Sequence, residues 1–343
     1  MAEKIAVAMS GGVDSTVCAA LLMKNHEVRG FFMNLGLPDQ MEQIARVGMV
    51  AERLGISLEI VDLAEVFARE IIDYFCRSYA AGTTPNPCVI CNPRIKFGRL
   101  LDAVRTRGIN KMATGHYVRV THEQNGSHLL RGLDHKKDQS YFLCGLSQEQ
   151  LQHLVFPLGG LTKDEVYRLA AGLGLDHRPG AESQDVCFLK NQGPGDFLKR
   201  RTDCAKGDIV TQNGKKVGSH EGVFHYTIGQ RRGLGVCDRT PFYVTGLDAA
   251  NKQVIVGKEE DLWHNELLVR AVNWLAGAAP QLPARFEVKI RYRHQAAVAD
   301  IYEEGKLLRV VFVQAQRAIT PGQFAVFYDN DEVIGGGEIA GRA

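Results

Sequence analysis

Hydrophobic and polar positions follow two different periods along the chain. Up to about residue 187, short apolar runs alternate with segments whose apolar residues recur at helical spacing. The predicted strands span residues 4–9, 27–33, 57–61 and 111–114, and the predicted helices span residues 15–24, 40–54 and 96–107. Strands that alternate with helices indicate an α/β fold, in which helices cover both faces of a parallel sheet.

From about Gly207 the apolar positions recur at every second residue. Asn213-Gly214 separates two alternating runs, which is the pattern of a β-hairpin. Further short apolar runs follow with little helical spacing, and a break near residues 262–265 divides them. We therefore expect an α/β domain at residues 1–200, a small β-rich central domain at 201–263 and a C-terminal β-barrel at 264–343.

Residues 85–93 read PNPCVICNP and do not fit either period. Pro85, Pro87 and Pro93 each lack a backbone N–H and have a fixed φ, which disfavours a helix interior or a central strand. The sequence predicts a structured loop that carries Cys88 and Cys91.

Composition excludes several classes of protein. The 343 residues include 45% hydrophobic and 23% charged residues, with a net charge of +2, so extensive disorder and a fibrous repeat are excluded. No apolar run reaches the roughly 18 residues of a membrane span, and the N-terminal residues lack the apolar region of a secretion signal. We expect a cytoplasmic protein without a membrane partner. Its eight cysteines are then more typical of catalysis or metal binding than of a disulfide scaffold.

A Gly-rich string, Ser10-Gly11-Gly12-Val13-Asp14-Ser15, lies between the first predicted strand and the first predicted helix. Glycines let the backbone approach phosphates closely, and the helix start offers free N–H groups to them. The string lacks the Lys-Ser/Thr ending of a Walker loop and the spacing of a dinucleotide fingerprint.

This string resembles the pyrophosphate loop of the N-type ATP pyrophosphatases, which activate a carbon by adenylation and release pyrophosphate. The resemblance implies ATP with Mg²⁺, a loop that binds the leaving phosphates, and Asp14 near the metal. Met33 and Gly115 follow the second and fourth predicted strands, at the sheet edge where nucleotides bind. The expected nucleotide-binding residues are Ala8, Met9, Ser10, Gly11, Gly12, Val13, Asp14, Ser15, Met33 and Gly115.

Further motifs narrow the resemblance within that superfamily. They are Asn86–Asn92 with Ile95–Gly98, Thr114–Tyr117 with Lys137–Leu143, Glu182–Phe188, Tyr226–Gly233 and Thr320–Gln323. Together they resemble the tRNA-specific 2-thiouridylases, which place sulfur on C2 of the wobble uridine of tRNA. The resemblance extends from Ile5 to about Gly337.

The resemblance assigns roles to individual residues. Cys187 would carry sulfur as a persulfide and Cys91 would be the attacking thiol, and a persulfide relay protein or a cysteine desulfurase would supply the sulfur. For the other cysteines at 18, 76 and 144, which lie in helical or apolar contexts, we expect small buried side chains. The residues expected to contact tRNA are Asn86, Pro87 and Cys88 at the base, His116, Lys137, Asp138 and Gln139 at the anticodon stem-loop, and Arg291, Tyr292 and Gln323 in the barrel.

Cys88 departs from the family pattern, which commonly has Asp at this position. Cys88 is interpreted as a resolving thiol for Cys91, as a neutral replacement, or as one of three ligands, with Cys91 and Cys187, of a 4Fe-4S cluster that would accept sulfide. A structural zinc site is less favoured because no fourth ligand is evident. Two other functions also remain open: an adenylating synthetase for a small molecule, and an RNA-binding protein with a vestigial nucleotide site.

Overall fold

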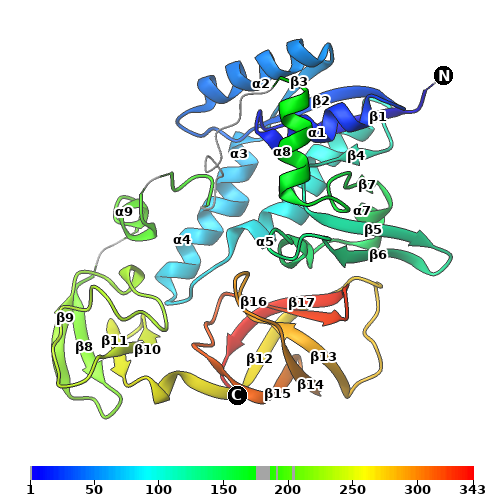
Figure 1. The fold of residues 1–343 in the computed structure, drawn as a ribbon. Coiled ribbons are helices and arrows are strands. Elements are labelled where there is room, and N and C mark those ends of the chain that lie inside the picture. The colour runs from blue at the N-terminus through cyan, green and yellow to red at the C-terminus, as the bar shows by residue number, and fades with distance from the viewer. Residues whose placement is uncertain (1, 175–185, 191, 203–204) are drawn as a thin grey trace.

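The computed structural model describes residues 2–174, 186–190, 192–202 and 205–343 (Figure 1). Residues 182–185 of the motif around Cys187 lie outside the described residues, and so does Cys204.

The N-terminal part of the chain contains a five-stranded parallel sheet in the order β3-β2-β1-β4-β7. Its strands are β1 (Lys4–Ala8), β2 (Glu27–Asn34), β3 (Ser57–Asp62), β4 (Met112–Ala113) and β7 (Leu154–Val155). Ile5 and Val7 of β1 pack into one hydrophobic cluster, whereas Ala6 between them packs into another. Because alternate side chains point to opposite faces, both faces of the sheet are covered, and the predicted α/β class is confirmed.

Helices and helical turns cover the two faces. The α-helices are α1 (Val13–Leu22), α2 (Gln40–Leu54), α3 (Ala64–Phe67), α4 (Asp73–Ala80), α5 (Pro87–Cys91), α6 (Leu101–Arg105), α7 (Gln148–Gln152), α8 (Lys163–Gly172) and α9 (Pro194–Leu198). Two π-helices, η1 (Ala68–Ile72) and η2 (Asn92–Leu100), and three 3₁₀ turns, η3 (Ser140–Leu143), η4 (Val223–His225) and η5 (Glu260–Leu262), complete the set in the described ranges. Helix α2 has the predicted bounds and ends at Gly55 in the left-handed conformation.

The predicted loop at residues 85–93 is wrong, because residues 87–93 of this segment are helical. Asn86 is the N-cap of α5, and Pro87 is its first residue, where a missing N–H costs no hydrogen bond. The chain continues from Cys91 without a break into η2, which contains Pro93 in its first turn. Pro87 and Pro93 therefore lie where a helical segment begins, and they do not indicate an irregular loop.

The C-terminal part of the chain forms a closed antiparallel barrel. Its strands follow the order β12-β15-β14-β13-β16-β17, and β12 pairs with β17 to close it. The strands are β12 (Trp263–Trp274), β13 (Ala284–Lys289), β14 (Ala297–Glu304), β15 (Leu307–Arg317), β16 (Phe324–Asp329) and β17 (Glu332–Gly341). Each of these six strands, all within the described residues, pairs on both sides, which confirms the predicted barrel.

A four-stranded sheet lies between these two parts in sequence, in the order β10-β11-β8-β9. Its strands are β8 (Gly207–Thr211), β9 (Lys216–His220), β10 (Tyr243–Asp248) and β11 (Gln253–Gly257). Strands β8 and β9 form the predicted antiparallel hairpin, with Gly214 at a φ of 81° in its turn. This sheet has a hydrophobic cluster of its own. The domain limits at residues 200 and 263 stay a prediction.

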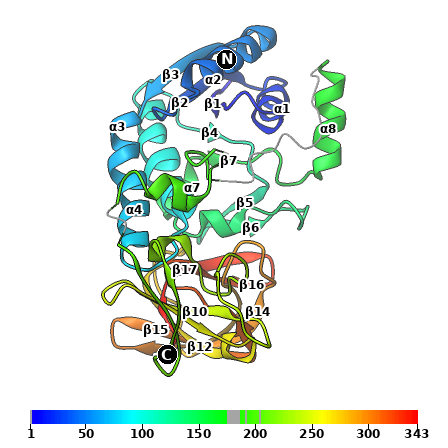
Figure 2. The same ribbon diagram turned by 90° about the vertical axis from the view of Figure 1, so that its left-hand side faces the viewer.

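The barrel and the N-terminal part share a hydrophobic cluster. Phe324 and Tyr328 of the barrel belong to the same cluster as Phe31 and Tyr141. A hairpin that the sequence did not predict, β5 (Val118–Glu123) and β6 (Gly126–Arg131), pairs with β17 and extends the barrel sheet. It lies between the parallel sheet and the barrel (Figures 1 and 2).

Candidate functional site: a phosphate loop and a thiol cluster

The Gly-rich loop lies at the carboxyl end of β1, between strands β2 and β4. The chain passes from β1 to β2 on one side and later returns to β4 on the other side, so the strand order reverses at β1. In open parallel sheets a ligand crevice lies at such a point, beyond the carboxyl ends of the strands. Gly11 has a φ of +72°, and a Cβ there would lie 3.2 Å from the backbone nitrogen of Val47. Gly12 is the N-cap of α1 and makes no side-chain cap. The positive end of the helix is therefore left open toward the crevice.

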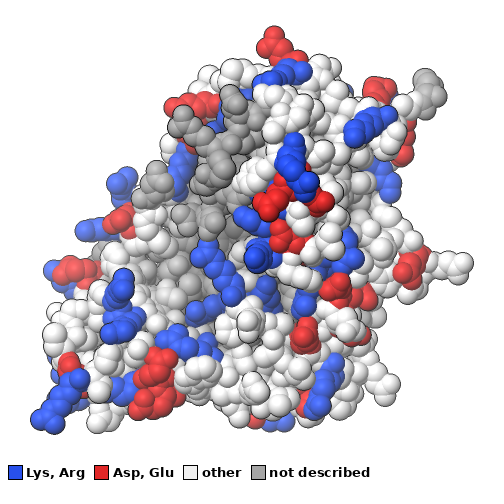
Figure 3. All heavy atoms as spheres, viewed as in Figure 1, with Lys and Arg blue, Asp and Glu red and all other residues white. Residues whose placement is uncertain are grey.

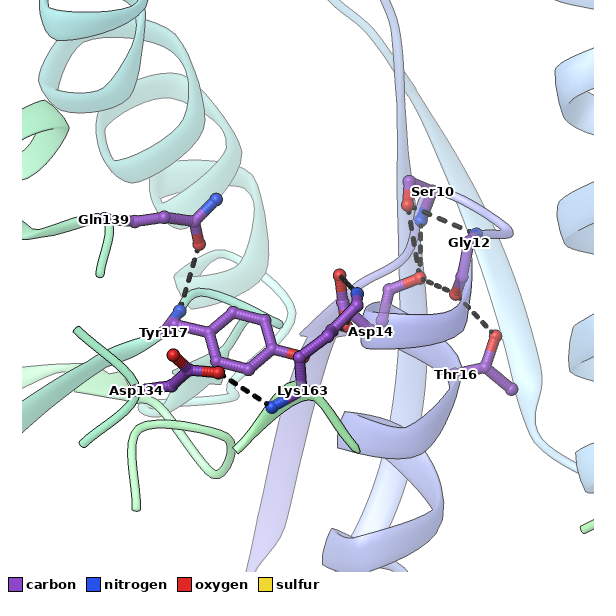
Figure 4. Close-up of polar contacts among 9 residues, drawn as sticks. Ser10, Gly12, Asp14, Thr16, Tyr117, Asp134, Gln139 and Lys163 are labelled. Carbon is purple, nitrogen blue, oxygen red and sulfur yellow. Dashed lines mark hydrogen bonds and ion pairs between the residues drawn. The ribbon is translucent and has the colours of Figure 1, made fainter. Parts of the chain in front are cut away.

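Hydroxyl groups fix the shape of this loop (Figure 4). Ser15 Oγ donates to the carbonyl oxygen of Gly12 at 3.0 Å, and Thr16 Oγ1 donates to the same oxygen at 2.8 Å. Ser15 Oγ also accepts a hydrogen bond from the backbone nitrogen of Ser10 at 3.2 Å. The loop is thus held in shape before any ligand binds.

Asp14 is held by two residues that sequence reasoning missed. Its Oδ1 accepts a hydrogen bond from the Tyr117 hydroxyl at 2.7 Å, and its two oxygens lie 2.8 and 2.9 Å from Lys163 Nζ. The Lys163 side chain is only 7% exposed, whereas that of Asp14 is 33% exposed. Lys163 is the first residue of α8, and its backbone nitrogen donates to Asp134 at 3.1 Å (Figure 4). An ammonium group is therefore fixed beside the phosphate loop.

A local signal for Lys163 exists in the sequence. Thr162 and Glu165 form a capping box, in which Glu165 Oε2 accepts a hydrogen bond from the Thr162 backbone nitrogen at 2.7 Å. This pattern predicts a helix start at Lys163. It gives no indication that the helix start meets Asp14.

The other predicted nucleotide-binding residues lie around the same crevice at different depths. A Cβ on Gly115 would lie 2.8 Å from the carbonyl carbon of Asp14, so the segment after β4 packs directly against α1. Ala8 ends β1, and the backbone nitrogen of Met9 donates to the carbonyl of Phe31 at 2.8 Å. Met33 is half-buried on β2, one strand away from the loop.

These residues fit a triphosphate and its magnesium ion. An uncapped helix start and a nearby ammonium group bind phosphate oxygens. Magnesium in nucleotide sites is usually bound by one or two carboxylates together with the phosphates, and Asp14 is the carboxylate in this loop. Within the described part of the chain, no group of three or more His, Cys, Asp or Glu residues could hold a metal ion by itself. The phosphates of the nucleotide would therefore have to supply ligands beside Asp14.

Three cysteines form a second group of chemical interest. Cys88 and Cys91 lie on α5 and are half-buried, and Cys187 is exposed. Burial raises the pKa of Cys91 to about 12, and charge on Cys187 and on Cys88 adds to this rise. Although Cys187 as a residue is exposed, the protein around its thiol partly removes it from water, which raises its pKa to about 11, and Cys88 raises it further. The structure thus brings the three predicted cysteines near one another, with their thiols protonated.

The three thiols are not arranged as a metal site. Among the described residues they do not form a group of metal ligands, and the positive charge of Lys96 acts on each of them. The iron–sulfur cluster, which would need the three thiols to converge on it, stays a prediction.

A barrel loop supports the start of the cysteine-bearing helix. The backbone nitrogen of Thr84 donates to the Pro321 carbonyl at 2.9 Å, and Gln323 Nε2 donates to the Thr84 carbonyl at 2.8 Å. Asn86, two residues further on, hydrogen-bonds Tyr141 through its side chain, and Pro87 is buried. Predicted residues from both ends of the chain therefore meet at one place.

Replacing Gly322 by alanine is expected to displace this support. Gly322 has a φ of +89°, and a Cβ would lie 3.0 Å from three backbone atoms of Thr84. We expect Gly322→Ala to lower the free energy of unfolding by about 1–3 kcal/mol, because the left-handed conformation and the backbone clash both oppose alanine. Gly277→Ala is the matched control, since Gly277 also has a positive φ but no described neighbour within 4 Å. Chemical denaturation of both variants tests this, and equal losses would contradict the supporting contact.

The predicted stem-loop residues have clear structural partners. Asp138 is 5% exposed and accepts hydrogen bonds from the backbone nitrogens of Gly132 and Ser140 at 3.0 and 3.1 Å. Gln139 Oε1 accepts one from the Tyr117 backbone nitrogen at 3.0 Å, and Lys137 is half-exposed. Asp138 and Gln139 therefore order the chain around Tyr117, and contact with tRNA stays a prediction for all three.

His116 is packed rather than displayed on the surface. Its ring lies against Phe97 and Phe156, with centroids 5.7 and 6.1 Å away. Burial, followed by the charge of Lys96, holds the pKa of His116 well below its usual value. Its imidazole is therefore neutral.

Arg291 and Tyr292 lie where the barrel meets the other parts of the chain. Arg291 donates to the Ala318 carbonyl at 2.7 Å and to the Ile228 carbonyl at 3.3 Å, which links the barrel to the central β region. The Tyr292 ring lies 4.5 Å from that of Phe142. Lys and Arg side chains gather on the face between the N-terminal part and the barrel (Figure 3), as expected for a surface that binds nucleic acid.

The fold and the loop at the switch point of its sheet define a nucleotide-binding α/β protein with a barrel attached. Residues 3–191 match the family described as the tRNA methyl transferase HUP domain, residues 195–258 the tRNA methyl transferase PRC-barrel domain, and residues 264–339 the aminomethyltransferase beta-barrel domain. The chain is 45% identical to the tRNA-specific 2-thiouridylase MnmA of Desulfotalea psychrophila, over 97% of this chain and 98% of the relative. It is also 45% identical to the protein of that name from Syntrophotalea carbinolica, over 98% of this chain and 99% of the relative. The chain therefore belongs to the family of the tRNA-specific 2-thiouridylases.

One solved structure is similar to this chain only at a low level. An NMN synthetase from Francisella tularensis has 14% identity and a TM-score of 0.38 over 60% of this chain and 80% of its own, which is too low a similarity to bear on the fold. No helix in the described ranges combines the length and the apolar character needed to cross a membrane.

Proposed function

We propose that this protein is an ATP-dependent sulfurtransferase that converts the wobble uridine of tRNA to 2-thiouridine. The observation that carries the proposal is the pairing, in one α/β domain, of a phosphate loop with a group of cysteines from two distant segments. Relatives named for this activity align over nearly the whole chain, which supports it further.

Adenylation is needed because the O2 oxygen of uracil is a poor leaving group. ATP would transfer AMP to this oxygen and release pyrophosphate. The N–H groups at the start of α1 and the ammonium of Lys163 are placed to bind the phosphates that leave. Magnesium bound by Asp14 and the phosphates would neutralise negative charge there.

Sulfur transfer requires two cysteines in this proposal. The terminal sulfur of a persulfide on Cys187 forms a bond to C2, and the C2–O bond breaks as AMP leaves with the electron pair. The Cys91 thiol gives up its proton to water and attacks the Cys187 sulfur, and the S–S electron pair goes to the sulfur on C2. The two cysteines are oxidised to a disulfide while the sulfane sulfur is reduced to the thiocarbonyl, and an external thiol restores them.

Substrate contacts are assigned by the same proposal. Asn86, Pro87 and Cys88 would line the pocket of the extruded uridine, next to Cys91 on the same short helix. Lys137, Arg291 and Gln323 would contact the tRNA from the adjacent surface. A persulfide-carrying protein would supply the sulfur to Cys187, which is exposed.

One experiment separates this function from the two rivals. Purified protein is given ATP, a persulfide donor and tRNA that contains a wobble uridine, and both pyrophosphate and nucleosides are measured. We expect pyrophosphate release that depends on tRNA, together with 2-thiouridine. A small-molecule synthetase would release pyrophosphate without tRNA, and an RNA-binding protein would release none.

Cys88 provides a test of the iron–sulfur alternative. With a persulfide on Cys187 no cluster is needed, so we expect iron-free protein to thiolate tRNA and Cys88→Asp to retain most of this activity. The measurement is iron and sulfide analysis after anaerobic purification and reconstitution, with absorption near about 400 nm as the optical signal. Activity that requires bound iron and is lost in Cys88→Asp would contradict the persulfide route.

A further inference from the structure

The helix that carries Cys88 and Cys91 changes its winding directly after Cys91. Residues Asn92–Leu100 form the π-helix η2, a winding defined by hydrogen bonds to the carbonyl five residues earlier, whereas the Asn92 N–H where it begins still bonds to the Cys88 carbonyl four residues earlier. Gly98 lies five residues after Pro93, and a Cβ on Gly98 would lie 2.8 Å from the Pro93 carbonyl oxygen. π-helical turns are rare and occur often at functional sites, so this one requires an explanation.

A distant side chain stabilises this wider winding. Gln150 of α7 donates from its Nε2 to the carbonyl oxygens of Pro93 and Phe97, at 2.7 and 3.0 Å. Its Oε1 accepts a hydrogen bond from the Ser147 backbone nitrogen at 3.1 Å, which fixes the amide in the capping box of α7. The π-helix is therefore bound by tertiary contacts rather than by local preference.

The winding decides where Lys96 lies. Lys96 follows Cys91 by five residues. In an α-helix, residues five apart differ by about 140° around the axis, whereas the i to i+5 closure of a π-helix brings them to nearly the same side. The π-helix thus brings Lys96 toward the side of Cys91.

The ring of His116 holds the Lys96 ammonium in place. Lys96 Nζ lies 3.4 Å from His116 Nε2, and His116 Nδ1 lies 2.7 Å from Thr114 Oγ1. Since the imidazole is neutral and Nδ1 can donate to Thr114, Nε2 accepts from the ammonium. His116 therefore positions Lys96 without adding a second charge.

The charge of Lys96 is directed at the thiols. Across the described residues no carboxylate lies within ion-pair distance of it, although its side chain is half-buried. Its charge instead opposes the rise in the pKa of each of the three thiols, Cys88, Cys91 and Cys187. A fixed, half-buried cation whose charge acts on three thiols is suited to an anion that arrives during the reaction.

We propose that Lys96 binds the anionic terminal sulfur of the persulfide on Cys187 and orients it toward the base, and that the π-helix η2 places Lys96 for this task. This inference rests on the proposed function. It adds Lys96 as a sulfur-binding residue, and Gln150, Gly98 and His116 as residues that position it.

The test compares Lys96→Met, Lys96→Arg and the control Arg99→Met in single-turnover reactions. Arg99 lies on the same π-helix but contacts Glu70 at 3.6 Å, so the control removes a cation from another side. Each protein is first loaded with radioactive sulfur from a persulfide donor, then mixed with ATP and tRNA, and three quantities are followed: pyrophosphate, sulfur on the protein and 2-thiouridine.

We expect Lys96→Met to transfer sulfur about 100-fold more slowly, because one preorganised charge is lost at the reacting atom. Pyrophosphate release and tRNA affinity should stay within about twofold of the wild type. Lys96→Arg should recover part of the rate, and Arg99→Met should behave as the wild type. Gly98→Ala should show the same selective defect, since its Cβ forces the winding at Pro93 to change.

Three results would overturn the proposal. Sulfur transfer at the wild-type rate in Lys96→Met would remove its role. An equal loss of pyrophosphate release would make Lys96 a phosphate-binding residue instead. Absence of 2-thiouridine with the wild-type protein would overturn the proposed function itself and, with it, this inference. The wild-type reaction distinguishes this case from the other two, because in those the wild-type protein still forms 2-thiouridine.

Discussion

Replacing either Cys91 or Cys187 by serine is expected to abolish 2-thiouridine formation and to leave the earlier steps intact. A serine hydroxyl cannot carry sulfane sulfur and cannot close a disulfide, so the chemical step loses a nucleophile rather than a binding contact. We expect a rate loss of at least about 10³-fold. Binding of tRNA and tRNA-dependent release of pyrophosphate should remain near the wild-type level, because neither uses the thiols.

The two serine variants should differ in one measurement. Cys187→Ser should not retain sulfur from a persulfide donor, whereas Cys91→Ser should retain it and fail to release it. Cys237→Ser is the matched control, because Cys237 is an exposed free cysteine that precedes β10 in the central β region. Normal thiolation by either active-site variant would show that the persulfide assignment is wrong.

Replacing Asp14 by asparagine is expected to stop ATP turnover in a folded protein. Asparagine keeps an oxygen that accepts hydrogen bonds from Tyr117 and Lys163, but it removes the charge that a magnesium ion requires. We expect tRNA-dependent pyrophosphate release to fall by about 10²-fold or more. Turnover comparable with the wild type would mean that Asp14 only shapes the turn.

Alanine at this position should have a second effect, on stability. The Lys163 side chain is 7% exposed, so Asp14→Ala leaves its ammonium buried without a carboxylate and, unlike Asp14→Asn, without any acceptor oxygen at this position. Loss of one partner of such a pair costs about 3 kcal/mol or more in the free energy of unfolding. Tyr117→Phe is the control that removes a hydrogen bond from Asp14 but no charge, and it should keep most of the turnover. Chemical denaturation with pyrophosphate assays on all three variants separates stability from chemistry.

Elements with a strong local pattern were predictable from the sequence. Helix α2 has its predicted bounds, and strand β2 extends one residue beyond the predicted run, because regular apolar spacing and the stop at Gly55 act within a few residues. The hairpin around Asn213-Gly214 follows from turn chemistry, which is also local. The Gly-rich loop was found for the same reason, since its string occupies six consecutive residues.

Features that depend on distant contacts were not predictable. Lys163 meets Asp14 across 149 residues, and its sequence signal gives only a helix start. The π-helix depends on Gln150, which lies 57 residues beyond Pro93. The three prolines around Cys88 and Cys91 disfavour a helix interior, and this preference predicted a loop. Asn86 is the N-cap of a helix whose first residue is Pro87, and this helix start was not recognised in the sequence. That the charge of Lys96 acts on the thiols could not be inferred without that winding.

The barrel and the α/β part bury their apolar residues against each other, and this has a consequence for how the catalytic geometry is maintained. Tyr141, fully buried, donates to the Phe324 carbonyl at 3.1 Å, and Asn273 donates to the carbonyls of Cys144 and Leu146 at 2.8 and 2.9 Å. Two regions joined in this way lose their structure cooperatively. A cavity opened deep in the barrel, far from any reacting atom, would therefore lower the fraction of molecules in which the helix of Cys88 and Cys91 is correctly formed. Inherited changes in the barrel core would then reduce cellular thiolation through protein abundance, even where the rate constant of each folded molecule is unchanged.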